Sequence, residues 1–236
     1  MRRRPADPRS ASLEGVQAAD SRERAPLAPR SVRPTPIRVG VRDHARYPAR
    51  VKRPHVLGVD EGPFAKGQLE PVPLVAALCE GADLVEAVAR SSFPVDGDGA
   101  TEFLARWLGS LRFRPSLQGI ALGGITLAGL ALVDVRALSD ALETPVLVVT
   151  RRPPDNARLR QALDAAGLSS RFSIAARSPE ALPTGDGIWL AHAGIDRDGA
   201  LALLRASSGK AKLPEALRIA HLVATALVRG ESHGRS

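Results

Sequence analysis

The spacing of apolar and polar residues divides the chain into two parts of different character. Residues 1–36 are rich in Arg, Pro, Ala and Ser and show no apolar period, so we expect a disordered basic leader. Residues 37–54 alternate weakly, and we expect an extended segment that either adds an edge strand or lies loosely on the domain. A folded pattern begins at Val56 and predicts one domain over 55–230, followed by a short tail at 231–236.

Three apolar runs predict the first part of a sheet. The run Val56–Asp60 predicts a buried strand, because β-branched and apolar residues fit a sheet that is covered on both faces. The two runs that follow flank Glu80–Gly81–Ala82 and predict an antiparallel hairpin with its turn at these residues. The folded part therefore opens with three neighbouring strands.

Helices and strands alternate after this hairpin. Residues 100–111 carry apolar side chains at helical spacing, and Asp155 and Asp196 stand where they would cap the starts of two helices. The other expected strands are 117–122, 145–150, 171–175 and 187–191, and the expected helices are 100–111, the later part of 125–142, 155–166, 196–206 and 213–229. This order predicts a mixed sheet with helices on its faces.

Charge is distributed unevenly along the chain. The formal net charge is +8, but residues 1–54 carry +9 and the remainder carries −1, so the folded part is about neutral. A basic chain suggests nucleic acid as a partner. Here that suggestion applies to the leader alone, and an arginine-rich coding bias in a disordered segment explains it equally well.

The composition also indicates the cellular compartment in which we expect the protein. Cys79 is the one cysteine, so no internal disulfide can form, and its apolar surroundings predict a small buried side chain. No apolar stretch reaches the length of about 18 residues that a membrane helix needs. The Arg-rich N-terminus lacks the apolar segment of a secretory signal. We therefore expect a cytoplasmic protein with no membrane partner.

Two adjacent carboxylates end the first predicted strand. Asp60 and Glu61 follow the apolar run, and Gly62–Pro63 then breaks the strand. Acids at the end of a central strand are costly to bury unless they are paired or bound to a cation. Asp60 is therefore the best candidate for a functional carboxylate, and a pair of solvated turn acids is the alternative.

Five landmarks in order resemble one family: HVLGVDEGPF, VDGDGAT, LGGITLAGLALVDV, PVLVVTRRP and PEALRIAHLVA. Residues 52–229 resemble the archaeal and bacterial endonuclease dU family, which is related to endonuclease V. The resemblance implies an α/β, ribonuclease H-like fold, in which three antiparallel strands precede alternating helices and parallel strands. It also implies cleavage of damaged or deaminated nucleic acid, with DNA favoured over RNA, and Mg²⁺ or Mn²⁺ as the cofactor.

The resemblance assigns roles to individual residues. The expected catalytic residues are Asp60, Glu61, Asp98 and Asp134, and the expected metal ligands are Asp60, Asp96 and Asp98. The residues expected to contact nucleic acid or to support the metal ligands are Arg151, Arg152, Arg218 and His221. Simpler roles stay open: turn-forming acids at 96 and 98, an arginine ion pair for Asp134, and solvated arginines at 151 and 152.

The chain departs from the family pattern at two acids. The second acid of the family's DG-x-D-A-T turn falls on Gly99, and the acid of its D-G-I-T segment falls on Gly123. We therefore expect the metal to bind weakly, if at all, and the endonuclease activity to be weakened or lost. The alternative is a non-catalytic relative that binds nucleic acid or a protein, in keeping with one Tyr, two Trp and five Phe in the whole chain.

Overall fold

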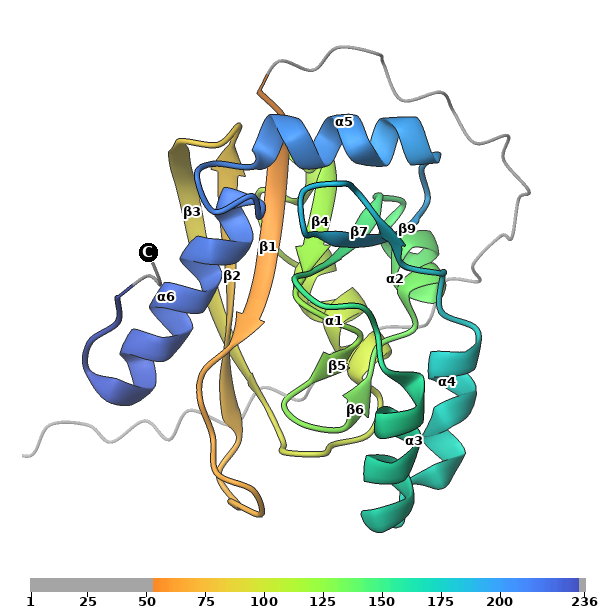
Figure 1. Cartoon of the computed structure of the whole chain (residues 1–236). Helices are drawn as coiled ribbons and strands as arrows, with labels where there is room; N and C mark the ends of the chain where they lie inside the picture. Colours follow the sequence, from red (N-terminus) through yellow and green to blue (C-terminus); the bar gives the residue numbers. More distant parts are fainter. Residues whose placement is uncertain (1–52, 234–236) are drawn as a thin grey trace, which may run out of the picture. The chain divides into compact units, whose positions relative to one another are not determined.

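A computed structural model describes residues 53–233, which form a mixed α/β domain (Figure 1). The leader expected at 1–36, nearly all of the segment at 37–54 and the end of the tail lie outside the described residues. Among the helices of the described part, none is long and apolar enough to cross a membrane.

Seven strands form the central sheet. In sheet order they are β3 (Leu84–Phe93), β2 (Val72–Glu80), β1 (His55–Glu61), β4 (Gly119–Leu122), β7 (Val146–Thr150), β9 (Trp189–Ala193) and β8 (Leu182–Pro183). Strands β1, β2 and β3 are antiparallel neighbours, whereas β4 is parallel to β1 and β7 is parallel to β4. This order confirms the ribonuclease H-like sheet expected from the sequence.

Two expectations about the later elements were wrong. Strand β9 runs antiparallel to β7, so the parallel alternation ends there. Residues 171–175 are not a strand: a 3-10 turn at Ser169–Arg171 leads into helix α4 (Phe172–Ala176). A short apolar run cannot distinguish strand from helix, and here Phe172 and Ala175 pack with Leu163 in a small separate core.

Helices cover both faces of the sheet. The covering helices are α1 (Ala100–Gly109) and α2 (Val135–Leu142) on one face and α5 (Arg197–Ser207) and α6 (Glu215–Arg229) on the other. Helix α3 (Asn156–Ala165) packs with α4 in the separate small core. Because alternate residues of a strand point to opposite faces, Leu57 and Val59 pack with α1 and α2, whereas Val56 packs with α5 and α6. A β5–β6 hairpin (Thr126–Leu127 and Ala131–Leu132) lies outside the main sheet.

The packing of α6 on β1 depends on Gly58. A Cβ atom at this position would lie 2.1 Å from the Leu217 backbone nitrogen and 2.4 Å from the Ala216 carbonyl oxygen. Glycine is therefore needed for the close approach of strand and helix backbones. The contact fixes α6 alongside the strand that carries Asp60. Cys79 is fully buried, as predicted.

Candidate functional site at the end of β1

Asp60 is held between its own strand and α6. Strand alternation turns the Asp60 side chain toward the α6 face, where its Oδ2 atom lies 2.8 Å from His221 Nδ1. Its Oδ1 atom accepts a hydrogen bond of 2.9 Å from the Glu61 backbone N–H. The Asp60 side chain is 24% exposed and the His221 side chain 61% exposed, so solvent reaches this pair from the helix side.

Glu61 points toward the opposite face of the sheet and resists ionisation. Burial, reinforced by the charge of Asp60, raises the pKa of Glu61 to about 7, although a hydrogen bond from the Ala128 backbone N–H lowers it. Near neutral pH this side chain therefore exchanges a proton readily. A carboxyl group that holds its proton is a weaker cation ligand than an ionised one.

Asp96, in the loop between β3 and α1, contacts the same β5–β6 turn that contacts Glu61. The Asp96 backbone N–H donates to the Ala128 carbonyl at 2.9 Å, and the Leu130 N–H donates to Asp96 Oδ1 at 2.7 Å. Asp96 adopts a φ of 53°, which aspartate tolerates better than most residues. The turn of the β5–β6 hairpin thus brings Glu61 and Asp96 together, and Asp96 anchors it.

Asp98 and Asp134 are each paired with an arginine. Asp98 forms an ion pair with Arg171, which also donates to the Leu130 carbonyl at 3.0 Å. Asp134 caps α2 by accepting from the Ala137 N–H at 3.1 Å, and it forms a 2.6 Å ion pair with Arg177. Partial burial would raise the pKa of Asp134, but the Arg177 and Ala137 hydrogen bonds outweigh it and lower the pKa.

The two glycines at expected acid positions occupy different surroundings. Strands β1 and β4 pair Val59 with Leu122, so the next residue along each chain brings Gly123 beside Asp60. A Cβ atom at Gly123 would meet no atom within 4 Å. Gly99 precedes α1 with a φ of 71°, and a Cβ atom there would lie 3.6 Å from Glu102 Oε2. Gly123 is therefore the position at which a second carboxylate would lie next to Asp60.

A groove of about 860 Å³ lies near the start of α6. Its charged lining residues are Arg151, Lys210, Lys212, Arg218, Asp186 and Glu215. Glu215 orients Arg218 through a hydrogen bond of 2.9 Å to the guanidinium Nε–H and raises the pKa of Arg218. Since Arg218 and His221 lie three residues apart on α6, the groove and Asp60 are separated by about one helical turn.

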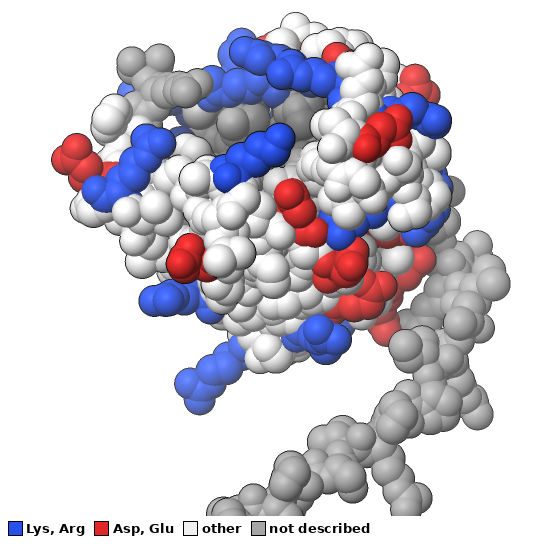
Figure 2. Space-filling view, turned by 90° about the horizontal axis from the view of Figure 1, so that it is seen from below, with Lys and Arg blue, Asp and Glu red and all other residues white. Residues whose placement is uncertain are grey.

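The expected arginines thus separate into different roles. Arg151 lines the groove, whereas the exposed Arg152 accepts a hydrogen bond from Thr150 through its backbone carbonyl. A further arginine, Arg160 on α3, was not among the expected residues, and its guanidinium packs 3.9 Å from the centre of the Phe172 ring. In the view of Figure 2 the surface is of mixed charge, with acidic side chains gathered on one side and basic side chains along the border of a hollow.

Within residues 53–233, only one group of three or more metal-ligating side chains has its ligand atoms close together, and it lies elsewhere, at the start of β1. The expected acids Asp60, Asp96, Asp98 and Asp134 do not form such a group. Sequence reasoning missed Arg171 and Arg177, whose pairing with the acids depends on the helical conformation of the segment around residues 169–177. Because we expected a strand at 171–175, the sequence did not indicate that these arginines would lie close to the acids.

Comparison with known proteins supplies the family. The model of the family described as endonuclease dU matches residues 52–228. A UPF0215 protein of Methanothermobacter thermautotrophicus is 32% identical, over 76% of this chain and 90% of its own length. A crystal structure of a protein of unknown function from Archaeoglobus fulgidus has a TM-score of 0.69 and 32% identity, covering 75% of this chain and 99% of its own. Endonuclease V of Ciona intestinalis, in complex with DNA containing inosine, has a TM-score of 0.47 and 12% identity, over 72% of this chain and 83% of its own.

Proposed function

Because the chain belongs to the endonuclease dU family, we propose that it is a nuclease relative that binds nucleic acid and cleaves phosphodiester bonds weakly or not at all. DNA is the favoured partner, with deaminated bases as the substrate class. The observation that carries the proposal is the pairing of strand ends: Asp60 has Gly123 beside it, where the family pattern places an acid. Of these two neighbouring strand-end positions, only residue 60 carries a carboxylate.

The remaining acids are a poor donor set for Mg²⁺. This ion takes oxygen ligands in near-octahedral geometry, supplied by one or two carboxylates together with water and substrate phosphate. Both oxygens of Asp60 already have hydrogen-bonding partners, and Glu61 titrates only near pH 7. Asp98 and Asp134 are neutralised by Arg171 and Arg177. The residues present therefore fall short of the set that a two-metal nuclease requires.

Binding of nucleic acid is supported by the groove beside α6. Its four basic and two acidic residues leave a formal charge of +2 in a body that is otherwise about neutral. Phosphates attract such a cluster in a salt-dependent manner. Arg218 lies in the groove and His221 contacts Asp60, so a strand that follows α6 would pass from the groove to the end of β1.

The test compares binding with cleavage. Oligonucleotides that contain deoxyuridine or deoxyinosine are incubated with the full chain and with Asp60→Asn, in Mg²⁺ and in Mn²⁺. We expect both proteins to bind at low salt and to cleave at similarly low rates. Robust cleavage that Asp60→Asn abolishes would show an active enzyme, and absence of binding at low salt would favour a protein partner; either result overturns the proposal.

A further inference from the structure

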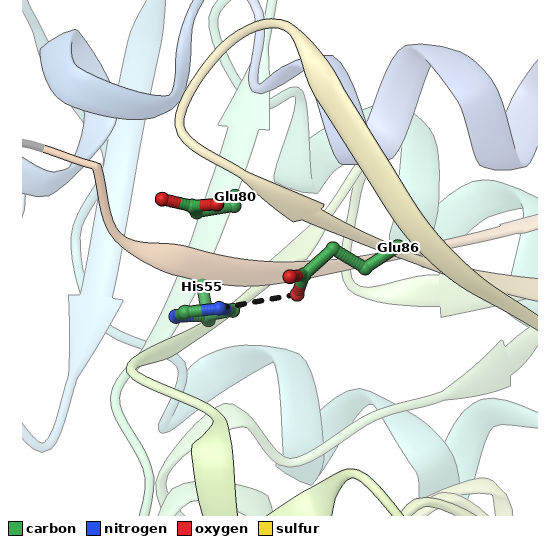
Figure 3. Close-up of side chains that lie close together, drawn as sticks. All are labelled: His55, Glu80 and Glu86. Carbon is green, nitrogen blue, oxygen red and sulfur yellow. Dashed lines mark ion pairs between the residues drawn. The ribbon is translucent and has the colours of Figure 1, made fainter.

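Three metal-ligating side chains meet at the start of β1, at the opposite end of that strand from Asp60. His55 lies on β1, Glu80 on β2 and Glu86 on β3, and one ligand atom of each lies within 4.8 Å of the others. Figure 3 shows the imidazole and the two carboxylates side by side. With about 3.3 Å per strand residue, His55 and Asp60 are roughly 16 Å apart.

The sheet register explains why these side chains meet. His55 and Glu80 are directly opposed on antiparallel strands, so their side chains share one face. Between β2 and β3 the register shifts, with Leu78 opposite Ala87 and Cys79 opposite Val85.

Glu86 is therefore the extra residue of a β-bulge. In an unbroken ladder it would lie opposite the buried Cys79, on the face that α6 covers. In the bulge its Oε2 atom instead lies 3.1 Å from His55 Nε2. Bulges commonly redirect a side chain in this way.

The environment of the group suits an exchangeable cation. The exposed fractions of the His55, Glu80 and Glu86 side chains are 30%, 29% and 33%, so an ion can enter from solvent. The His55 backbone N–H donates to Gln118 Oε1 at 3.0 Å, which fixes the start of the strand. Arg53 donates to Glu80 Oε1 at 3.1 Å and also pairs with Asp83, so it competes with a cation for Glu80.

We propose that His55, Glu80 and Glu86 form a binding site for a divalent transition metal of the Zn²⁺ class. One imidazole and two carboxylates suit Zn²⁺, with nitrogen and oxygen ligands at about 2.0–2.2 Å and a fourth position left for water. The imidazole disfavours Mg²⁺, which prefers oxygen ligands. Rotation of the two glutamate side chains closes the remaining distance between the ligands.

Metal binding replaces two existing contacts. A metal bound at His55 Nε2 requires the neutral imidazole with its proton on Nδ1, so the contact between Nε2 and Glu86 is lost. Arg53 leaves Glu80 and keeps its ion pair with Asp83. The bound ion then joins β1, β2 and β3 at one end of the sheet, and it stabilises the folded state because the unfolded chain lacks the assembled site.

Equilibrium dialysis of the full chain against ZnCl₂ or MgCl₂, followed by thermal unfolding, tests this site. We expect one Zn²⁺ per chain, a raised unfolding temperature with Zn²⁺ but not with Mg²⁺, and at least tenfold weaker Zn²⁺ binding in His55→Ala and Glu86→Gln. Arg53→Ala should bind Zn²⁺ more tightly because a competing cation is removed. The matched controls His233→Ala and Glu70→Gln should bind as the unmodified chain does.

The opposite results would overturn the site. The proposed site is refuted if the full chain binds no Zn²⁺. It is also refuted if the His55→Ala and Glu86→Gln variants bind Zn²⁺ as tightly as the unmodified chain does. If His55→Ala does not fold, Glu86→Gln alone decides, since Glu86 is exposed on β3 and the amide preserves its shape.

Discussion

His221 Nδ1 lies 2.8 Å from Asp60 Oδ2 and so joins residues that are 161 positions apart in the sequence. The contact connects α6, which borders the basic groove, to the strand end that carries the principal candidate carboxylate. The Asp60 carboxylate is therefore an oriented group, and a cation that binds there must share it with an imidazole.

Glu61 makes the stability of the domain depend on pH. Its pKa rises from 4.5 in the unfolded chain to about 7 in the fold, so the protonated form stabilises the fold below pH 4.5, and this contribution is lost as the pH rises through 7. Between about pH 5 and pH 8 we expect the free energy of unfolding to fall by roughly 2–3 kcal/mol from this group. Glu61→Gln should remove most of that loss in urea titrations.

The exposed Glu70→Gln variant is the control for this experiment, and it should keep the pH dependence of the unmodified chain. Parallel stability curves for Glu61→Gln and the unmodified chain would show that Glu61 is not the responsible group.

We expect Asp134 to stabilise the fold by capping α2 and by its ion pair with Arg177. Asp134→Ala removes the cap of α2 and the partner of Arg177, and should lower the free energy of unfolding by about 1–2 kcal/mol. Asp134→Asn should cost less, because an amide oxygen still caps. Since the pKa of Asp134 is lowered from 3.8, its contribution is present above that pH and is lost as the pH falls through the folded-state value.

Urea unfolding at neutral and acidic pH measures the Asp134 contribution, with Asp140→Ala on the exposed side of α2 as the control. An Asp134→Ala variant as stable as Asp140→Ala would refute the structural role.

The basic groove predicts a salt-dependent loss of DNA affinity. The double variant Arg151→Ala, Lys210→Ala should weaken binding of a single-stranded oligonucleotide and reduce the slope of log K against log salt by about 1–2. Fluorescence anisotropy at several salt concentrations gives both quantities. The control Lys66→Ala, Arg90→Ala removes equal charge from exposed positions outside the groove. Equal losses in the two double variants would indicate attraction by net charge alone.

Local signals in the sequence were sufficient for most of the elements. The run Val56–Asp60, the hairpin turn at Glu80–Gly81–Ala82 and the caps Asp155 and Asp196 were all confirmed, because each depends on neighbouring residues. The segment 171–175 was not predictable in this way, since its conformation is decided by packing against Leu163.

The candidate site was harder to predict from the sequence than the fold was. The family pattern directed attention to Asp60, but its contact with His221 depends on the close approach of α6 at Gly58. The group of His55, Glu80 and Glu86 depends on a bulge that no local motif marks. Contacts between distant strands and helices are set by tertiary packing, and the local patterns of one sequence do not reveal them.

Gly123 offers a direct test of the proposal that the metal site at Asp60 has lost a ligand. Gly123→Asp is cleaner than a change at Gly99, where a φ of 71° adds backbone strain to any substitution. A Cβ atom at Gly123 meets no neighbour, so the new carboxylate should be tolerated beside Asp60. Gly124→Asp adds the same charge one residue further along and is the matched control.

The decisive measurement is a Mn²⁺ titration of Gly123→Asp and Gly124→Asp, each combined with Glu86→Gln so that the His55 group does not contribute. We expect Gly123→Asp to bind Mn²⁺ at least tenfold more tightly than the Glu86→Gln parent, and Gly124→Asp to match the parent. Unchanged affinity in Gly123→Asp, or an equal gain in Gly124→Asp, would contradict the placement of the lost ligand beside Asp60.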